Sequence, residues 1–200
     1  MPERGFTLVE LMVTLTLIAI LAALAAPSFG VWIKNSQVRT SAEALQSGLR
    51  TAQAEALRRS RQVVFSLTNS ASPQTSLTAT QDGKYWSINT VALPVAETGT
   101  PNADVAQFVE SGVLGASGNG VVIEGPAAIC FSSLGRLVVN SGPGVAGADC
   151  TVANIPGIYK VSTPGSDRPL RVRVEVGGQV RMCDPAKTMS DTHPDGCPPV

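Results

Sequence analysis

The residues with the clearest potential for chemistry stand at the start of the chain. Gly5 and Phe6 precede a single acid, Glu10, at the edge of a run from Leu11 to Ile33 that contains no charged residue. Placing an ionised carboxylate at the centre of a bilayer costs about 2.5 kcal/mol or more, so an acid beside such a run is a candidate functional residue. A membrane anchor that happens to have an acidic flank is the alternative interpretation.

The four cysteines indicate a second kind of chemistry. Four cysteines allow three pairings, and we favour Cys130 with Cys150 and Cys183 with Cys197 because each bond would anchor a segment of little apolar content. Each bond would contribute about 3 kcal/mol in the chain-entropy model. The alternative is a zinc site formed by Cys183, His193 and Cys197, although the chain has no Cys-x-x-Cys pair.

Catalytic signatures are missing from the sequence. His193 is the only histidine, and no Gly-x-Ser-x-Gly elbow accompanies it. The glycines between Gly112 and Gly120 lack the Gly-x-Gly-x-x-Gly spacing of a phosphate-binding loop. We therefore predict a protein that is not an enzyme and that holds no cofactor and no metal.

A basic stripe is predicted near the C-terminus. Between residues 160 and 187, six basic side chains outnumber three acids, and Arg171, Arg173 and Arg181 would share one face of a hairpin. Such a stripe can meet the phosphates of DNA, whereas a solvated strand face is the simpler interpretation. Over the whole chain, fifteen acids balance fifteen lysines and arginines, so no global field attracts nucleic acid.

The element that must position Glu10 is a long N-terminal helix over residues 6–61. Its run from Leu11 to Ile33 would extend about 35 Å as a helix, enough to cross a bilayer core of about 30 Å, and we predict a transmembrane segment over 11–33. Pro27 lies inside this run and predicts a kink or local melting. The rival interpretation is a cleaved secretory signal peptide, with a mature chain beginning near Ala26.

The second half of this helix, from Lys34 to Arg61, is predicted to be amphipathic. Six apolar residues recur at alternating intervals of four and three, which places them on one helical face that packs against the chain's own domain. They are Val38, Ala42, Leu45, Leu49, Ala52 and Ala56.

Residues 62–200 are predicted to form a β-rich head. Charged residues make up 15% of the chain, and 19 glycines and 14 prolines favour loops and short strands. Residues 170–176 alternate between apolar and charged side chains before a turn at Gly177 and Gly178. We expect strands near 62–67, 84–88, 107–114, 121–123, 129–131, 136–139, 158–161, 170–176 and 179–183. The tail from 184 to 200 is expected to be irregular and tied by a disulfide.

The hexapeptide Gly5-Phe6-Thr7-Leu8-Val9-Glu10, followed by the apolar run, resembles the class III signal of type IV pilins and of the pseudopilins of type II secretion. The resemblance implies a leader of residues 1–5 that prepilin peptidase removes after Gly5, and N-methylation of Phe6. It also implies that Glu10 pairs with the terminal amine of a neighbouring subunit. The mature protein would be a single-pass protein of the inner membrane with its head in the periplasm, where the cysteines can oxidise.

A second resemblance concerns the head. Phe131-Ser-Ser-Leu-Gly135-Arg136 and the late Arg-Val-Arg hairpin resemble GspH/FimT-like minor pilins. It implies an α+β fold in which the long helix packs on an antiparallel, sandwich-like β domain. The implied function is a structural subunit of a type IV pilus or a type II secretion pseudopilus, with other pilins, prepilin peptidase and inner-membrane lipid as partners.

Two alternatives remain open from the sequence. Some FimT-like pilins take up DNA through a Gly-Arg-x-Arg motif, and the matching positions here read Gly178-Gln179-Val180-Arg181, in which Gln179 replaces the first arginine. The other alternative is a secreted periplasmic binding module without a filament role.

Overall fold

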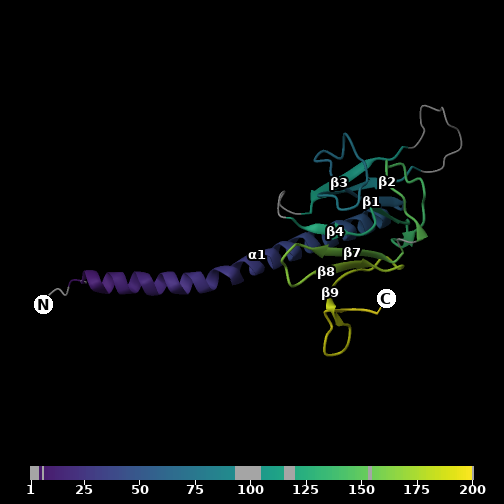
Figure 1. Cartoon of the computed structure of the whole chain (residues 1–200). Coiled ribbons are helices and arrows are strands. Elements are labelled where there is room, and N and C mark those ends of the chain that lie inside the picture. Colours follow the sequence, from purple (N-terminus) through teal and green to yellow (C-terminus); the bar gives the residue numbers. More distant parts are fainter. Residues whose placement is uncertain (1–4, 6, 93–104, 115–119, 153–154, 200) are drawn as a thin grey trace.

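A 52-residue helix, α1 (Leu8–Arg59), extends from the N-terminus into a head made of two β-sheets (Figure 1). The computed structural model describes residues 5, 7–92, 105–114, 120–152 and 155–199, and the side chains of 24–28 lie outside the described residues. The strands are β1 (Val63–Thr68), β2 (Tyr85–Thr90), β3 (Phe108–Val113), β4 (Val122–Glu124), β5 (Ala128–Phe131), β6 (Leu137–Val138), β7 (Gly157–Ser162), β8 (Leu170–Val174), β9 (Val180–Thr188) and β10 (Gly196–Cys197). The predicted α+β fold is confirmed.

The helix ends where its sequence supplies a C-terminal cap. Ser60 adopts a left-handed conformation with φ of 50°, and the backbone N–H of Arg61 donates to the carbonyl of Ala56 at 3.2 Å. Arg58 and Arg59 lie in the last turn, where positive charge complements the helix dipole. α1 therefore stops two residues before the predicted end at Arg61.

The C-terminal half of α1 lies against both sheets. All six residues of the predicted apolar stripe, from Val38 to Ala56, are completely buried. They join one core with inward side chains from the two sheets, such as Phe65 of β1, Tyr159 of β7 and Val172 of β8. The predicted stripe and its packing against the chain's own head are confirmed.

The two sheets have five strands each. The first has the order β3-β2-β1-β5-β6 and is antiparallel throughout, whereas the second has the order β10-β9-β8-β7-β4 and contains one parallel pair, β9 with β10. In β8, Val172 and Val174 face the core and Arg171 and Arg173 alternate with them. The turn after β8 is a three-residue loop in which Gly178, with φ of 89°, follows the two central residues.

The prediction for the tail was wrong in part. β9 continues through Pro185 to Thr188, and Gly196 and Cys197 form β10 beside it. Proline is tolerated because β8 pairs with β9 only from Val180 to Cys183. Beyond Cys183 one side of β9 needs no ladder donor, which is where a strand accepts proline.

Over the part of the chain that the structure describes, no helix is both long enough and apolar enough to cross a membrane. The predicted transmembrane segment, 11–33, includes residues 24–28, whose side chains lie outside the described residues. The helix assignment itself continues through position 27, and the kink at Pro27 stays a prediction.

Candidate functional site

The first turn of α1 carries the acid that the sequence singled out. Thr7 caps the helix, and its hydroxyl oxygen accepts a hydrogen bond from the backbone N–H of Glu10 at 3.3 Å. Glu10 is exposed, and it is the only charged residue between Leu8 and Ile33. A carboxylate in the first turn is stabilised by the helix dipole, and this one is open to a partner from outside the chain.

The surface that continues from Glu10 is almost entirely apolar. Fourteen large apolar side chains of this half of α1 are between 36% and 70% exposed, and we call them the apolar helix surface. They are Leu8, Val9, Leu11, Met12, Val13, Leu15, Leu17, Ile18, Ile20, Leu21, Phe29, Val31, Trp32 and Ile33. A contiguous exposed patch of this kind marks a site for other protein chains or for lipid.

Two threonine hydroxyls that lie among these apolar side chains are hydrogen-bonded inside the helix. The hydroxyl of Thr14 donates to the carbonyl of Leu11 at 2.9 Å, and that of Thr16 donates to the carbonyl of Val13 at 2.8 Å. These bonds remove the cost of burying a free hydroxyl in apolar surroundings. The surface can therefore be covered by apolar groups without leaving these two hydroxyls unpaired.

The predicted processing site is only partly described. Phe6 lies outside the described residues, as does the side chain of Pro27. Gly5 is exposed, and a Cβ built there would have no atom within 4 Å. The fold of this chain therefore does not itself require glycine at position 5.

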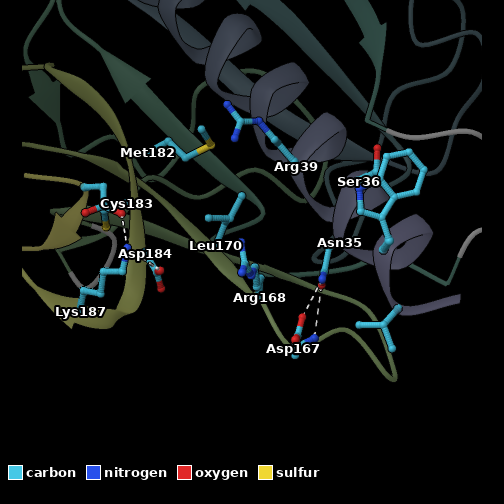
Figure 2. Close-up of a pocket in the computed structure, with 13 residues that line it drawn as sticks. Asn35, Ser36, Arg39, Asp167, Arg168, Leu170, Met182, Cys183, Asp184 and Lys187 are labelled. Carbon is cyan, nitrogen blue, oxygen red and sulfur yellow. Dashed lines mark hydrogen bonds and ion pairs between the residues drawn. The ribbon is translucent and has the colours of Figure 1, made fainter. Parts of the chain in front are cut away.

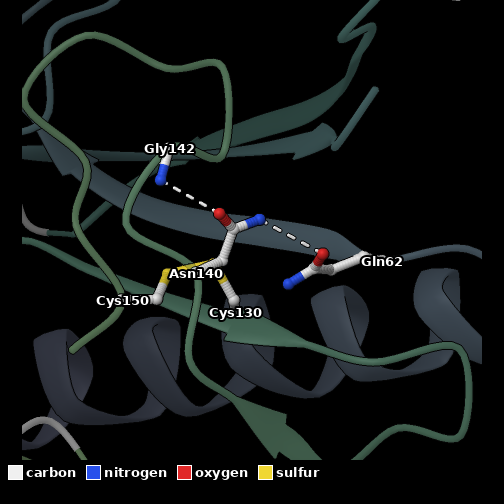
Figure 3. Close-up of a disulfide and its surroundings, with 5 residues drawn as sticks. All are labelled: Gln62, Cys130, Asn140, Gly142 and Cys150. Carbon is white, nitrogen blue, oxygen red and sulfur yellow. Dashed lines mark hydrogen bonds between the residues drawn. A yellow bond between two sulfur atoms is a disulfide. The ribbon is translucent and has the colours of Figure 1, made fainter. Parts of the chain in front are cut away.

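The first disulfide joins Cys130 of β5 to Cys150, with Cα atoms 5.7 Å apart (Figure 3). Asn140 closes the intervening loop, because its backbone exchanges two hydrogen bonds with Cys150. Its side-chain amide also donates to the Oε1 atom of Gln62 at 3.2 Å, and its Oδ1 atom accepts from the N–H of Gly142 at 3.0 Å. The disulfide and these bonds hold a second, smaller core on the outer side of the first sheet.

The second disulfide joins Cys183 of β9 to Cys197 of β10, with Cα atoms 4.9 Å apart. The structure thus has the local pairing for all four cysteines. With both sulfurs bonded to each other, the alternative zinc site lacks its two thiolate ligands. His193 is exposed in a tight turn, where its Nδ1 atom lies 3.0 Å from the hydroxyl of Thr192.

The three predicted arginines lie on one face of the second sheet, but they differ in their surroundings. Arg173 and Arg181 are direct cross-strand partners, and Arg171 lies on the same face of β8. The Nε atom of Arg173 is 2.8 Å from Oε1 of Glu175 without hydrogen-bond geometry, and its side chain is only 16% exposed. Arg181 is exposed, whereas Arg171 is half-buried with its Nε atom out of contact with water. The face is basic but not a continuous row of free cations.

Glu55 accounts for the basic cluster at the end of α1. Its carboxylate accepts from Arg58 at 2.6 Å and from Arg59 at 2.7 Å. The hydrogen bond from Arg58, followed by that from Arg59, lowers the pKa of Glu55 below its usual value. These two arginines stabilise the helix end, so they need no external ligand to explain them.

A groove of about 730 Å³ lies where α1 leaves the head (Figure 2). We call it the junction groove. Its walls come from α1, from the segment before β8, from β9 and from the tail. The lining residues used below are Val31, Trp32, Asn35, Ser36, Asp167, Arg168, Leu170, Met182, Asp184, Lys187 and Asp195.

A reciprocal pair fixes one wall of the junction groove. The side-chain amide of Asn35 donates to Oδ1 of Asp167 at 2.6 Å, and the backbone N–H of Asp167 donates to Oδ1 of Asn35 at 3.3 Å. On the opposite wall, Lys187 contacts Asp195, and this hydrogen bond raises the pKa of Lys187. The sequence analysis missed this groove because residues 132 positions apart form it, and no local pattern indicates such a contact.

Comparison with known proteins identifies the family. The model of a family described as "Prokaryotic N-terminal methylation motif" matches residues 1–26. The fimbrial protein EcpC of Eikenella corrodens is 33% identical over 126 residues, covering 62% of this chain and 76% of that protein.

Among solved structures, the chain is similar to the type IV minor pilin FimU of Pseudomonas aeruginosa, with a TM-score of 0.48 and 15% identity over 77% of this chain and 96% of FimU. It is also similar to the minor pseudopilin EpsH of the Vibrio cholerae type 2 secretion system, with a TM-score of 0.42 and 11% identity over 76% of this chain and 99% of EpsH. Identity to the fimbrial protein over three quarters of its length and the methylation motif lead to one conclusion: the chain belongs to the type IV pilin and pseudopilin family.

Proposed function

We propose that this chain is a minor structural subunit of a type IV filament, either a type IV pilus or the pseudopilus of a type II secretion system. The observation that supports this role best is the division of α1 into two halves. From Val38 to Ala56 its apolar stripe is buried by the chain's own head, whereas the apolar helix surface has no cover within the described part of the chain. That surface would be buried by the equivalent helices of neighbouring subunits.

Glu10 would direct this packing. It is an exposed carboxylate in an apolar surface, so covering the surface without supplying a cation would leave a poorly solvated charge. The terminal amine of a neighbouring subunit, produced when prepilin peptidase cuts after Gly5 and then N-methylated at Phe6, would supply that cation. The open space around Gly5 supports this role, since the glycine then serves the peptidase and not the fold.

Before assembly, we propose that the apolar half of α1 rests in the inner membrane and that the head lies in the periplasm. The two disulfides support an oxidising compartment for the head. Because the members of this family are filament subunits, we assign the chain a structural role and not a catalytic one.

The first experiment is intact mass and N-terminal analysis of the full-length protein extracted from membranes. A mature chain that begins at N-methylated Phe6 is expected. A chain that begins near Ala26 would instead support a secreted periplasmic module and would overturn the filament role.

Two substitutions test the mechanism. Glu10→Ala should be processed normally but should enter filaments poorly, because the neighbouring amine loses its partner. The matched control is Glu43→Ala, which removes an exposed acid of the same helix whose partner, Arg39, lies 2.8 Å away within the chain. Normal incorporation of Glu10→Ala would refute the pairing.

Gly5→Val should remain unprocessed, and Gly30→Val, at another glycine with no atom within 4 Å of its built Cβ, should be processed. A Gly5→Val chain that is still shortened would count against the peptidase assignment.

The arginines on the second sheet support a second candidate, DNA binding by the filament. Within the described residues Arg171 and Arg181 have no ion-pair partner, while Arg173 lies against Glu175. Full-length protein should then bind duplex DNA with an affinity that falls as salt rises, and Arg181→Gln should weaken it. Binding that is absent at low salt removes this candidate.

A further inference from the structure

The junction groove is continuous with the apolar helix surface. Val31 and Trp32 belong to both, so whatever covers the end of the apolar surface also reaches the mouth of the groove. Trp32 is 68% exposed there. Tryptophan is enriched at the boundary between the hydrocarbon core and the headgroups of a bilayer.

The depth of the groove follows from helix geometry. If the predicted span ends at Ile33, the adjacent headgroup layer, about 5–7 Å thick, contains roughly the next four residues at about 1.5 Å each. Asn35 and Ser36 lie in this interval and line the groove, and Asn35 holds Asp167 beside them. The α1 wall of the groove, together with Asp167, therefore stands at the depth of lipid headgroups.

The groove presents charges of both signs. Arg168 is exposed and has no ion-pair partner within the described part of the chain, and it lies near enough to Lys187 to oppose the rise in the pKa of that residue. Asp184 is only loosely neutralised, because its Oδ2 atom is 3.8 Å from the Nζ atom of Lys187. Figure 2 shows these side chains, with Arg168 and Asp184 both at the groove.

We propose that the junction groove binds the phosphoethanolamine headgroup of a phospholipid while the chain resides in the membrane. The phosphate accepts hydrogen bonds from Arg168, the primary ammonium donates to Asp184, and Leu170 and Met182 contact the glycerol and the first carbons of the acyl chains. This inference rests on the membrane stage of the proposed function and names the lipid class that the helix exit selects.

The same groups discriminate between headgroups. A glycerol headgroup has no cation to offer Asp184, so it would fill the groove without pairing that carboxylate. A choline headgroup carries a charge but has no N–H to donate to the carboxylate. The groove thus favours a headgroup that has both a phosphate and a primary ammonium.

The test uses the full-length chain incorporated into lipid nanodiscs with equal amounts of phosphatidylethanolamine, phosphatidylglycerol and phosphatidylcholine. After gentle detergent extraction, native mass spectrometry counts the lipids retained on each chain. We expect one phosphatidylethanolamine per chain, retained about tenfold over either competitor, which is the effect of one charge-assisted hydrogen bond. Asp184→Asn should reduce that preference about tenfold, because only the ammonium contacts Asp184. Arg168→Gln should lower the retention of all three lipids about tenfold without changing the preference, because each carries the phosphate, and Arg168→Lys should keep most of the retention.

Arg136→Gln is the matched control, because Arg136 is an exposed arginine in the turn that contacts Gln53 of α1 through Gly135. Gln53 lies about 27 Å along the helix from Asn35. This variant should retain the lipid as the wild type does.

The outcomes separate the two proposals. A chain that incorporates into nanodiscs but retains the three lipids equally overturns the headgroup site and leaves the filament role standing. So does a preference that survives Asp184→Asn, or a retention that Arg168→Gln does not lower. A chain that fails to incorporate at all overturns both the membrane stage and the headgroup site.

Discussion

The indole of Trp86 lies in a slot whose two sides are glycines, and this arrangement predicts that Gly112→Ala destabilises the head. A Cβ built at Gly112 of β3 would lie 2.6 Å from two ring atoms of Trp86, and one built at Gly48 of α1 would lie 2.9 Å from the ring. Phe65 stacks beside the indole with ring centroids 6.0 Å apart. Because Trp86 is 7% exposed, its ring cannot move into solvent without leaving the core.

The magnitude follows from the overlap. Ordinary carbon contacts begin near 3.4 Å, so the added methyl at Gly112 must displace the ring or the strand by close to 1 Å, and overpacking of this kind costs about 1–3 kcal/mol. Replacing glycine by alanine also reduces the conformational entropy of the unfolded chain, which offsets about 0.4–1 kcal/mol of this cost. We expect a net loss of about 1–2 kcal/mol for Gly112→Ala. Gly48→Ala should cost less, because its contact is longer and alanine gains about 1 kcal/mol of helix propensity.

The assay is urea unfolding of the full-length chain in detergent, monitored by fluorescence in a Trp32→Phe background so that Trp86 alone reports. With an m-value of about 1–3 kcal/mol/M, Gly112→Ala should lower the midpoint by roughly 0.5–1 M and shift the native emission. Gly142→Ala is the control, since its built Cβ has no atom within 4 Å, and it should unfold like the wild type. A Gly112→Ala protein as stable as Gly142→Ala, with unchanged emission, would refute the steric argument.

Three further predictions concern the same head. Leu45→Ala should lower the free energy of unfolding by about 3 kcal/mol, since the residue is fully buried, and Leu57→Ala, at a half-exposed site of the same helix, by less than about 1 kcal/mol; equal losses would contradict the packing of α1. Replacing both Cys183 and Cys197 by serine should lower the free energy of unfolding by about 3 kcal/mol and should reduce the shift in thermal unfolding that a reductant causes. If the reductant still causes the full shift, that shift comes from the other disulfide. The pKa of Glu55 is lower in the folded than in the unfolded chain, so the ionised carboxylate stabilises the fold fully above the unfolded pKa of about 4.3, and this stability is lost as pH falls through the folded pKa. Glu55→Gln should therefore flatten the acid side of the plot of unfolding free energy against pH. An unchanged plot would show that the contacts of Glu55 with the arginines add nothing.

Local periodicity determined much of this structure. The six-residue stripe from Val38 to Ala56 was predicted from its spacing alone, since every member of such a row faces one side of a helix, and all six are buried. The alternation in 170–176 likewise indicated which side of β8 faces the core, as Val172 and Val174 confirm. The N-terminal hexapeptide indicated the family because its recognition signal is a short contiguous segment.

Only the tertiary structure decided the features that join distant segments. The parallel pairing of β9 with β10 was not predicted, although the disulfide between the same segments was, because a proline within β9 concealed the strand. The wall of the junction groove joins Asn35 to a residue 132 positions away. Spacing along the chain contains no information about such contacts, because they arise only when α1 and both sheets share one core.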